Sequence, residues 1–84
     1  MFTVYKLSAN ISDGTHYFSK IEGLSAKAVE LLNQRLQTKH IQTNELLQQC
    51  SPEAIRLNLT ESHEFYIVSV GSYTLRVTAL NINN

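Results

Sequence analysis

The stretch EFYIVSV-GS-YTLRVTAL, residues 64–80, decides the fold. β-Branched and aromatic residues fill residues 64–70 and 73–80, a composition typical of strands. Only Gly71 and Ser72 separate the two runs, and a two-residue loop that begins with glycine is typical of a type II′ hairpin. The stretch therefore predicts a β-hairpin, and with it an antiparallel sheet.

A second hairpin is predicted at the start of the sequence. Residues 2–11 alternate in the manner of a strand, and residues 16–22 are expected to return beside them. Asp13 and Gly14 lie between the two, and Asp-Gly is a strong turn signal because glycine tolerates a positive φ. The chain is therefore expected to open and to close with a hairpin.

Between the hairpins the apolar spacing becomes helical. Apolar residues recur at this spacing from Ala28 to Leu36, which predicts an amphipathic helix over residues 26–38 with Ser25 as its N-cap. Thr43 is expected to cap a second, shorter helix that ends near Cys50. Both helices should present one apolar face to the sheet.

A further strand is predicted after Pro52, which is expected to start a turn. Ile55, Leu57 and Leu59 alternate with polar residues, the pattern of a strand with one buried face. The prediction is a single α+β domain, residues 1–84, with element order β-β-α-α-β-β-β. Its five-stranded sheet, antiparallel or mixed, would carry one or two helices on one face.

Composition favours a nearly neutral protein. Charged residues make up 17% of the chain, against about 25% in typical domains, and the formal net charge is +0. This balance shows neither the basic excess of a nucleic-acid binder nor an acidic excess, and it does little to prevent self-association. The single cysteine, an opening segment unlike a signal peptide and the lack of a long apolar run together predict a cytoplasmic protein without a membrane anchor.

No motif for catalysis, metal binding or phosphate binding is present. His16, His40 and His63 fall in different predicted elements, and none has a partner at metal-ligand spacing. Cys50 has no local feature that would lower its pKa and is expected to be a small buried residue at a helix end. We therefore expect no metal, no cofactor and no enzymatic activity.

The strand at residues 65–70 is apolar on both faces, which leaves two orientations open. If Phe65 and Ile67 face the core, Tyr66, Val68 and Val70 form an outward row suited to binding. In the alternative, Tyr66, Val68 and Val70 face the helices and Phe65 packs at an edge. The first orientation defines the candidate interaction surface, which consists of Tyr66, Val68, Val70, Tyr73 and Arg76.

The favoured hypothesis is a non-enzymatic interaction module that binds a larger protein or protein complex. It would cover or bridge that partner, as an inhibitor or immunity-type protein encoded by a phage or mobile element. Homodimerisation through an exposed sheet edge or the outward apolar row is also expected to be compatible with this function. The alternative is a nucleic-acid-binding sheet face, in which tyrosines stack on bases and cations contact phosphates. The cations would be Lys6, Lys20, Arg56 and Arg76, all of which fall on predicted strands, with Tyr5, Tyr17 and Tyr73 nearby. A small enzyme assembled only by the fold is a third hypothesis.

Overall fold

The computed structural model describes residues 2–10, 14–39 and 44–82, and their side chains except at 36–39, 44–46 and 70. Asp13, His40 and Thr43, used in the predictions above, lie outside the described residues. The elements follow one another as β1 (Phe2–Ala9), β2 (Thr15–Phe18), α1 (Ile21–Lys39), α2 (Asn44–Gln49), α3 (Pro52–Leu59), β3 (Glu64–Val70) and β4 (Tyr73–Ile82).

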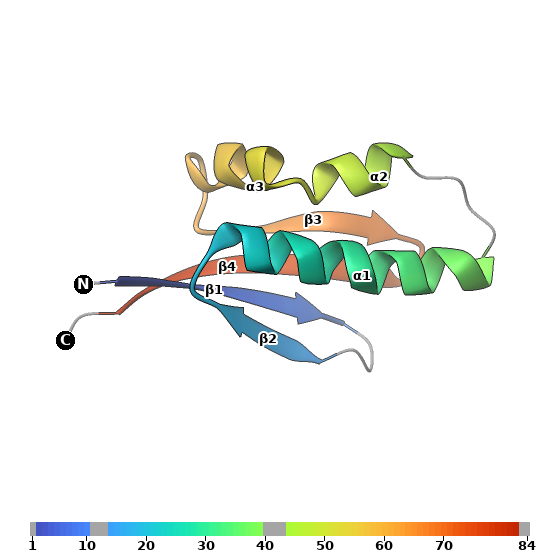
Figure 1. Cartoon of the computed structure of the whole chain (residues 1–84), viewed down its shortest axis with the longest axis horizontal. Helices are drawn as coiled ribbons and strands as arrows, with labels where there is room; N and C mark the ends of the chain where they lie inside the picture. Colours follow the sequence, from blue (N-terminus) through green and yellow to red (C-terminus); the bar gives the residue numbers. More distant parts are fainter. Residues whose placement is uncertain (1, 11–13, 40–43, 83–84) are drawn as a thin grey trace.

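The strands form one antiparallel sheet in the order β2-β1-β4-β3. The α+β class is confirmed, but the described part of the chain has four strands, so the prediction of five is wrong. β1 and β4 are the central pair, aligned from Phe2 opposite Ile82 to Ala9 opposite Leu75. Their pairing joins the two hairpins and brings the two ends of the chain together at one end of the sheet (Figure 1).

The closing hairpin forms as predicted. β3 and β4 pair across Gly71 and Ser72, with Val70 opposite Tyr73. Gly71 has a φ of 58°, a positive value that a two-residue hairpin loop needs and that glycine adopts without steric cost. Gly14, in the loop of the opening hairpin, also has a positive φ, of 80°.

The predicted strand after Pro52 is instead the helix α3. The Ser51 hydroxyl accepts a hydrogen bond from the Ala54 N–H at 3.2 Å, and Pro52 occupies the first turn, where its missing N–H costs nothing. Ile55 is fully buried, whereas Leu57 is 69% exposed. The two residues that contact the core, Ile55 and Leu59, are therefore four apart, as in a helix. The apparent alternation arose because the exposed Leu57 lies between them.

The helix α1 begins earlier than predicted, at Ile21, and the strand expected over 16–22 ends at Phe18. Gly23 lies in the first turn of α1, where a Cβ would come within 3.2 Å of Phe18 Cδ1. The residue predicted as N-cap, Ser25, is inside the helix and buried, and its hydroxyl donates to the Cys50 carbonyl at 2.5 Å. This bond ties α1 to the end of α2, the short second helix that the sequence predicted.

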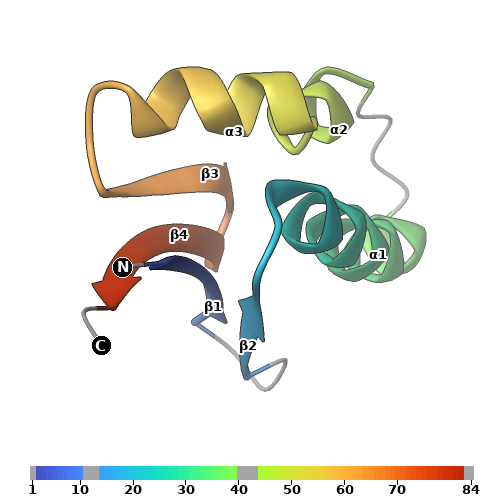
Figure 2. The same ribbon diagram turned by 60° about the vertical axis from the view of Figure 1, so that its left-hand side comes forward.

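All three helices lie on one side of the sheet, and Figure 2 shows no helix of the described chain across the other side. Leu7 of β1 and Leu75 and Val77 of β4 belong to one buried cluster with Leu24 of α1 and Ile55 of α3. Because side chains alternate along a strand, the neighbours of these residues point to the uncovered side. We call that side the open face.

Candidate functional site

The open face is built from rows of residues that lie side by side across the strands. One row runs from Tyr17 on β2 through Lys6 and Thr78 to Glu64 on β3. The next runs through Thr15, Ser8, Arg76 and Tyr66, again from β2 to β3. The middle of the open face is therefore polar, with one cation in each row.

Two tyrosines flank this polar middle on the outer strands. Tyr66 is 63% exposed and lies opposite Arg76, while Tyr17 is 61% exposed and lies opposite Lys6. Exposed aromatic rings on a sheet face supply large contact areas, and each carries a hydroxyl that can form a hydrogen bond to a partner. Each ring thus stands beside a cation on the neighbouring strand.

The end of the sheet near the two termini is apolar. Phe2 and Ile82 lie opposite each other and are 48% and 37% exposed. Val4 and Leu80, the next pair on the same face, are partly buried. We call these four residues the apolar end of the open face.

The structure places only part of the predicted surface on this face. Tyr66 is exposed and Arg76 is partly exposed, but Val68 is only 1% exposed and belongs to the core. The register between β3 and β4 shifts between Tyr66 and Val68, so that Ile67 and Val68 both point inward. The prediction of an outward row is therefore wrong at Val68, because it assumed an unbroken alternation and a bulge interrupts it.

The other two predicted residues do not enlarge the surface. Tyr73 is buried on the helix side, where the Arg35 guanidinium lies 4.9 Å from the centre of its ring. The side chain of Val70 lies outside the described part of the structure. Of the predicted set, the structure brings together Tyr66 and Arg76, in one row of the open face.

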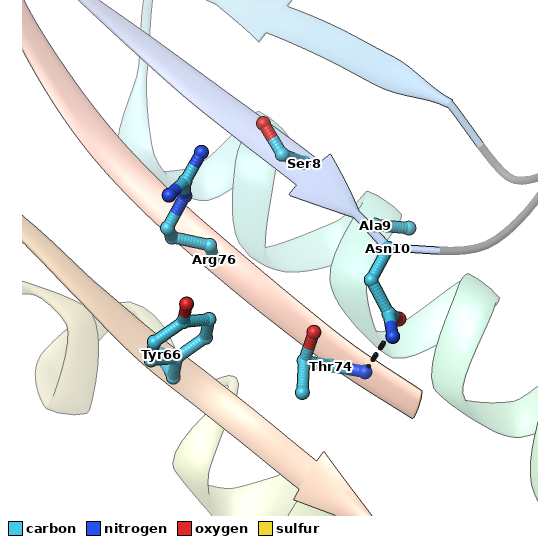
Figure 3. A pocket seen from close by; sticks show the side chains of 6 residues that line it. All are labelled: Ser8, Ala9, Asn10, Tyr66, Thr74 and Arg76. Atoms are coloured by element: carbon cyan, nitrogen blue, oxygen red, sulfur yellow. Dashed lines mark hydrogen bonds between the residues drawn. The ribbon is translucent and has the colours of Figure 1, made fainter. Parts of the chain in front are cut away.

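A hollow of about 210 Å³ lies beside these two residues (Figure 3). It lies where the end of β1 meets the start of β4, with Tyr66 of β3 beside it. It is lined by Ser8, Ala9, Asn10, Tyr66, Thr74 and Arg76, and each of these except Ala9 has a polar side chain. Asn10 shapes its rim, because its Oδ1 accepts from the Thr74 N–H at 2.8 Å and its amide nitrogen donates to the Ser72 carbonyl.

Two polar groups at the hollow have unusual surroundings. The Ser8 Oγ is shielded from solvent and has no hydrogen-bond partner among the described residues. Arg76 NH1 forms an ion pair with Glu64 Oε1 at 2.7 Å, with both side chains about half exposed. Sequence reasoning missed Ser8, Asn10 and Thr74, although their alternation with the buried Leu7 and Leu75 is a signal that could have found them.

The remaining chemistry-bearing residues do not gather. In the described residues no group of three or more histidine, cysteine or acidic side chains could hold a metal ion. Cys50 is fully buried, and desolvation raises the pKa of its thiol to about 11. Lys20 lies before α1 and Arg56 on α3, where it pairs with Glu22, so neither is on a strand as predicted.

In comparisons with known proteins, no family model, no curated protein and no solved structure matches this chain. None of the helices in the described residues has the length and apolar character needed to cross a membrane. Function therefore has to be inferred from the residues of the open face.

Proposed function

We propose that this protein is a non-enzymatic interaction module that binds a larger protein through the open face of its sheet. The observation that carries the proposal is the exposure of Tyr66 and Tyr17, at 63% and 61%, on a face that no described helix covers. A water-facing sheet surface is normally polar, and exposed aromatic side chains on it are typical of contact sites. Tyrosine and arginine are also the residues that most often dominate binding energy at interfaces.

The near-zero net charge of the chain is compatible with binding a partner through short-range contacts. With a net charge of +0, little long-range steering is expected, so affinity would come from contact area and hydrogen bonds. Inhibition is the specific form of this proposal, since a rigid sheet face can cover a functional surface of a larger protein. The single cysteine is a free, buried thiol, which suits the reducing cytoplasm in which we place the protein.

Nucleic-acid binding is the second candidate, favoured by the two tyrosine–cation pairs, Tyr17 with Lys6 and Tyr66 with Arg76. Stacked aromatics beside cations are the elements of single-strand recognition. However, Glu64 neutralises one of the two cations. Two further predicted members, Tyr5 and Tyr73, pack against or within the core, which reduces the set available to bases.

The test is affinity capture of the tagged full-length protein from a lysate of its native host, with and without nuclease. The wild type is compared with the double variant Tyr17→Ser/Tyr66→Ser. Leu57→Ser is the matched control, because Leu57 is similarly exposed at 69% but lies on α3, away from the open face. Circular dichroism would confirm that every variant is folded.

The expected result is one dominant protein that resists nuclease, is captured by the wild type and the Leu57 variant, and is lost from the double variant. The proposal fails if the double variant captures the same proteins as the wild type. Recovery that disappears with nuclease would instead support the nucleic-acid function, and its steep decline with added salt would support it further.

Homodimerisation is a separate proposal, based on the apolar end of the open face. Phe2 and Ile82 are exposed there as a pair, and burying them against a second copy would remove apolar surface from water. Light scattering should show a mass that rises with protein concentration, and Ile82→Ser should return it to the monomer mass. A constant monomer mass at millimolar concentration would contradict dimerisation.

A further inference from the structure

The hollow beside Tyr66 is lined by hydrogen-bond donors and holds one cation. Hydroxyl groups are supplied by Ser8, Tyr66 and Thr74, which come from three adjacent strands. Figure 3 shows these hydroxyls and the Arg76 guanidinium rising from the same side of the sheet. Hydroxyls can donate as well as accept, so together with the guanidinium they can bind a carboxylate, which accepts hydrogen bonds and carries one negative charge.

We infer that the hollow binds a carboxylate, supplied by an aspartate or glutamate side chain of the protein partner. The inference rests on the proposed function, because it names the chemistry by which the partner engages the open face. Arg76 would hold the carboxylate through charge-assisted hydrogen bonds, and the neighbouring hydroxyls would donate to its remaining lone pairs. Tyr66 would cover the bound group from the adjacent strand.

The ion pair between Arg76 and Glu64 shows that the guanidinium accepts a carboxylate on this face. Exposed ion pairs of this type contribute little net stability, so exchanging Glu64 for a partner's carboxylate costs little. Glu64 therefore acts as an internal competitor for the site.

The Ser8 hydroxyl is a second, independent indication that the hollow binds a hydrogen-bond acceptor. Its Oγ is shielded from solvent and has no hydrogen-bond partner among the described residues, an arrangement that native proteins usually avoid. Ser8 lies directly opposite Arg76 on the neighbouring strand. A carboxylate that reaches between them would provide the missing acceptor once a surrounding side chain shifts.

A phosphate fits the hollow less well than a carboxylate. Among the residues that line it, Arg76 is the one cation, and Glu64 lies within ion-pair distance of that guanidinium. A phosphodiester chain would also need several further cations along its path, and the two rows of the open face described above supply Lys6 alone besides Arg76. Displacement of Glu64 would leave one positive charge at the hollow, which matches the single charge of a side-chain carboxylate.

The test is a titration of the ¹⁵N-labelled full chain at pH 7 and constant ionic strength, followed by NMR. The probes are acetate and N-acetyl-glutamate amide, with chloride and inorganic phosphate as comparisons. We expect saturable shifts at the backbone amides of Ser8, Thr74 and Arg76 with both carboxylates, and none with chloride. Dispersed spectra would show that each variant is folded.

Substitutions at the two ends of the Arg76–Glu64 ion pair should change the affinity for carboxylates in opposite directions. Arg76→Gln should weaken carboxylate binding about tenfold or more, because it removes the charge-assisted hydrogen bonds. Glu64→Gln should tighten binding by about threefold, because it removes the competing carboxylate. The matched controls are Arg56→Gln and Glu22→Gln, which make the same charge changes at an ion pair on the helical side and should leave binding unchanged.

The inference is overturned if the carboxylates cause no saturable shift at the hollow, or if Arg76→Gln binds them as well as the wild type does. It is also overturned if Glu64→Gln and Glu22→Gln change binding equally, since the effect would then be one of net charge alone. Tighter binding of phosphate than of acetate would favour nucleic acid over an acidic partner. Each of these outcomes is separate from failure of the proposed function, which is read from partner capture by the tyrosine double variant.

Discussion

Replacing Ile55 by alanine should destabilise the protein strongly, whereas the same change at Leu57 should have almost no effect. Ile55 is fully buried in α3, and removing a buried isoleucine side chain typically costs about 2–5 kcal/mol, from which we expect about 3 kcal/mol. Leu57 is 69% exposed, so its replacement should change the free energy of unfolding by less than about 0.5 kcal/mol. The contrast arises because a helix separates these residues by 200° around its axis, at about 100° per residue.

The assay is urea unfolding followed by circular dichroism. A domain of 84 residues has a stability on the order of 4–12 kcal/mol, so the alanine variant of Ile55 should remain folded but lose a large fraction of it. The midpoint should fall without a change in slope, and Ile55→Val should give an intermediate loss of about 1 kcal/mol. Equal losses at Ile55 and Leu57 would refute the reasoning, because a strand with both side chains on one buried face predicts that result.

Four further predictions concern three residues, Ser25, Cys50 and Glu22. Ser25→Ala should lower the free energy of unfolding by about 1–2 kcal/mol, because the Cys50 carbonyl loses the hydroxyl that donates to it at 2.5 Å. Ala26→Ser is the control for helix propensity. An unchanged free energy of unfolding in Ser25→Ala would contradict the role of the hydrogen bond. Burial raises the pKa of Cys50 to about 11, so the native thiol should resist iodoacetamide at pH 8, and equal alkylation rates in native and unfolded protein would contradict this. Because the thiol has an ordinary pKa of 9.0 when unfolded, its contribution to stability should be complete below pH 9 and decline as the pH approaches 11, measurable by urea unfolding. The pKa of Glu22 is lowered by a hydrogen bond to its own backbone and by Arg56. Its contribution to the free energy of unfolding should therefore be present above its ordinary pKa of 4.5 and vanish as the pH falls. Glu22→Gln should remove this part of the acid dependence of stability, and an unaltered dependence would contradict the prediction.

The two hairpins could be predicted from sequence because their signals are local. Alternation along residues 64–80 and the glycine at position 71 are sufficient to specify two strands and the turn between them. The pairing of β1 with β4 is different, because it joins residues at opposite ends of the chain, and no local pattern encodes it. The order of the strands could therefore not be predicted, whereas the number of strands was wrong because the predicted third strand is the helix α3.

The helix α3 illustrates how a short apolar pattern can mislead. Three apolar residues at alternate positions fit a strand, yet two of them also fit a helix with a spacing of four. Ser51 and Pro52 carried the deciding information, since a serine followed by proline is a helix start as well as a turn. The cap was visible in the sequence, but the exposed Leu57 obscured its meaning.

The predicted outward row on β3 fails at Val68, and the bulge in β3 explains why. Strict alternation assigns Tyr66 and Val68 to one face, but the register shift between them turns Val68 inward while Tyr66 stays exposed. A bulge leaves no clear mark in a run of apolar residues, so its position could not be read from the sequence. The alternation of β4 is regular, so Arg76 lies on the open face while Tyr73 points to the helix side.

The regular central strands link the core to the proposed binding site. Leu7 lies opposite Val77 on the buried side, and their neighbours Ser8 and Arg76 lie opposite each other on the open face. A slip of one residue in this pairing would expose the core leucine and bury the arginine, so burial of the core strongly disfavours it. The energy that holds Leu7 in the core therefore also fixes the distance between Ser8 and Arg76. The carboxylate site would thus be organised before the partner arrives, and binding would require only the movement of side chains such as Glu64.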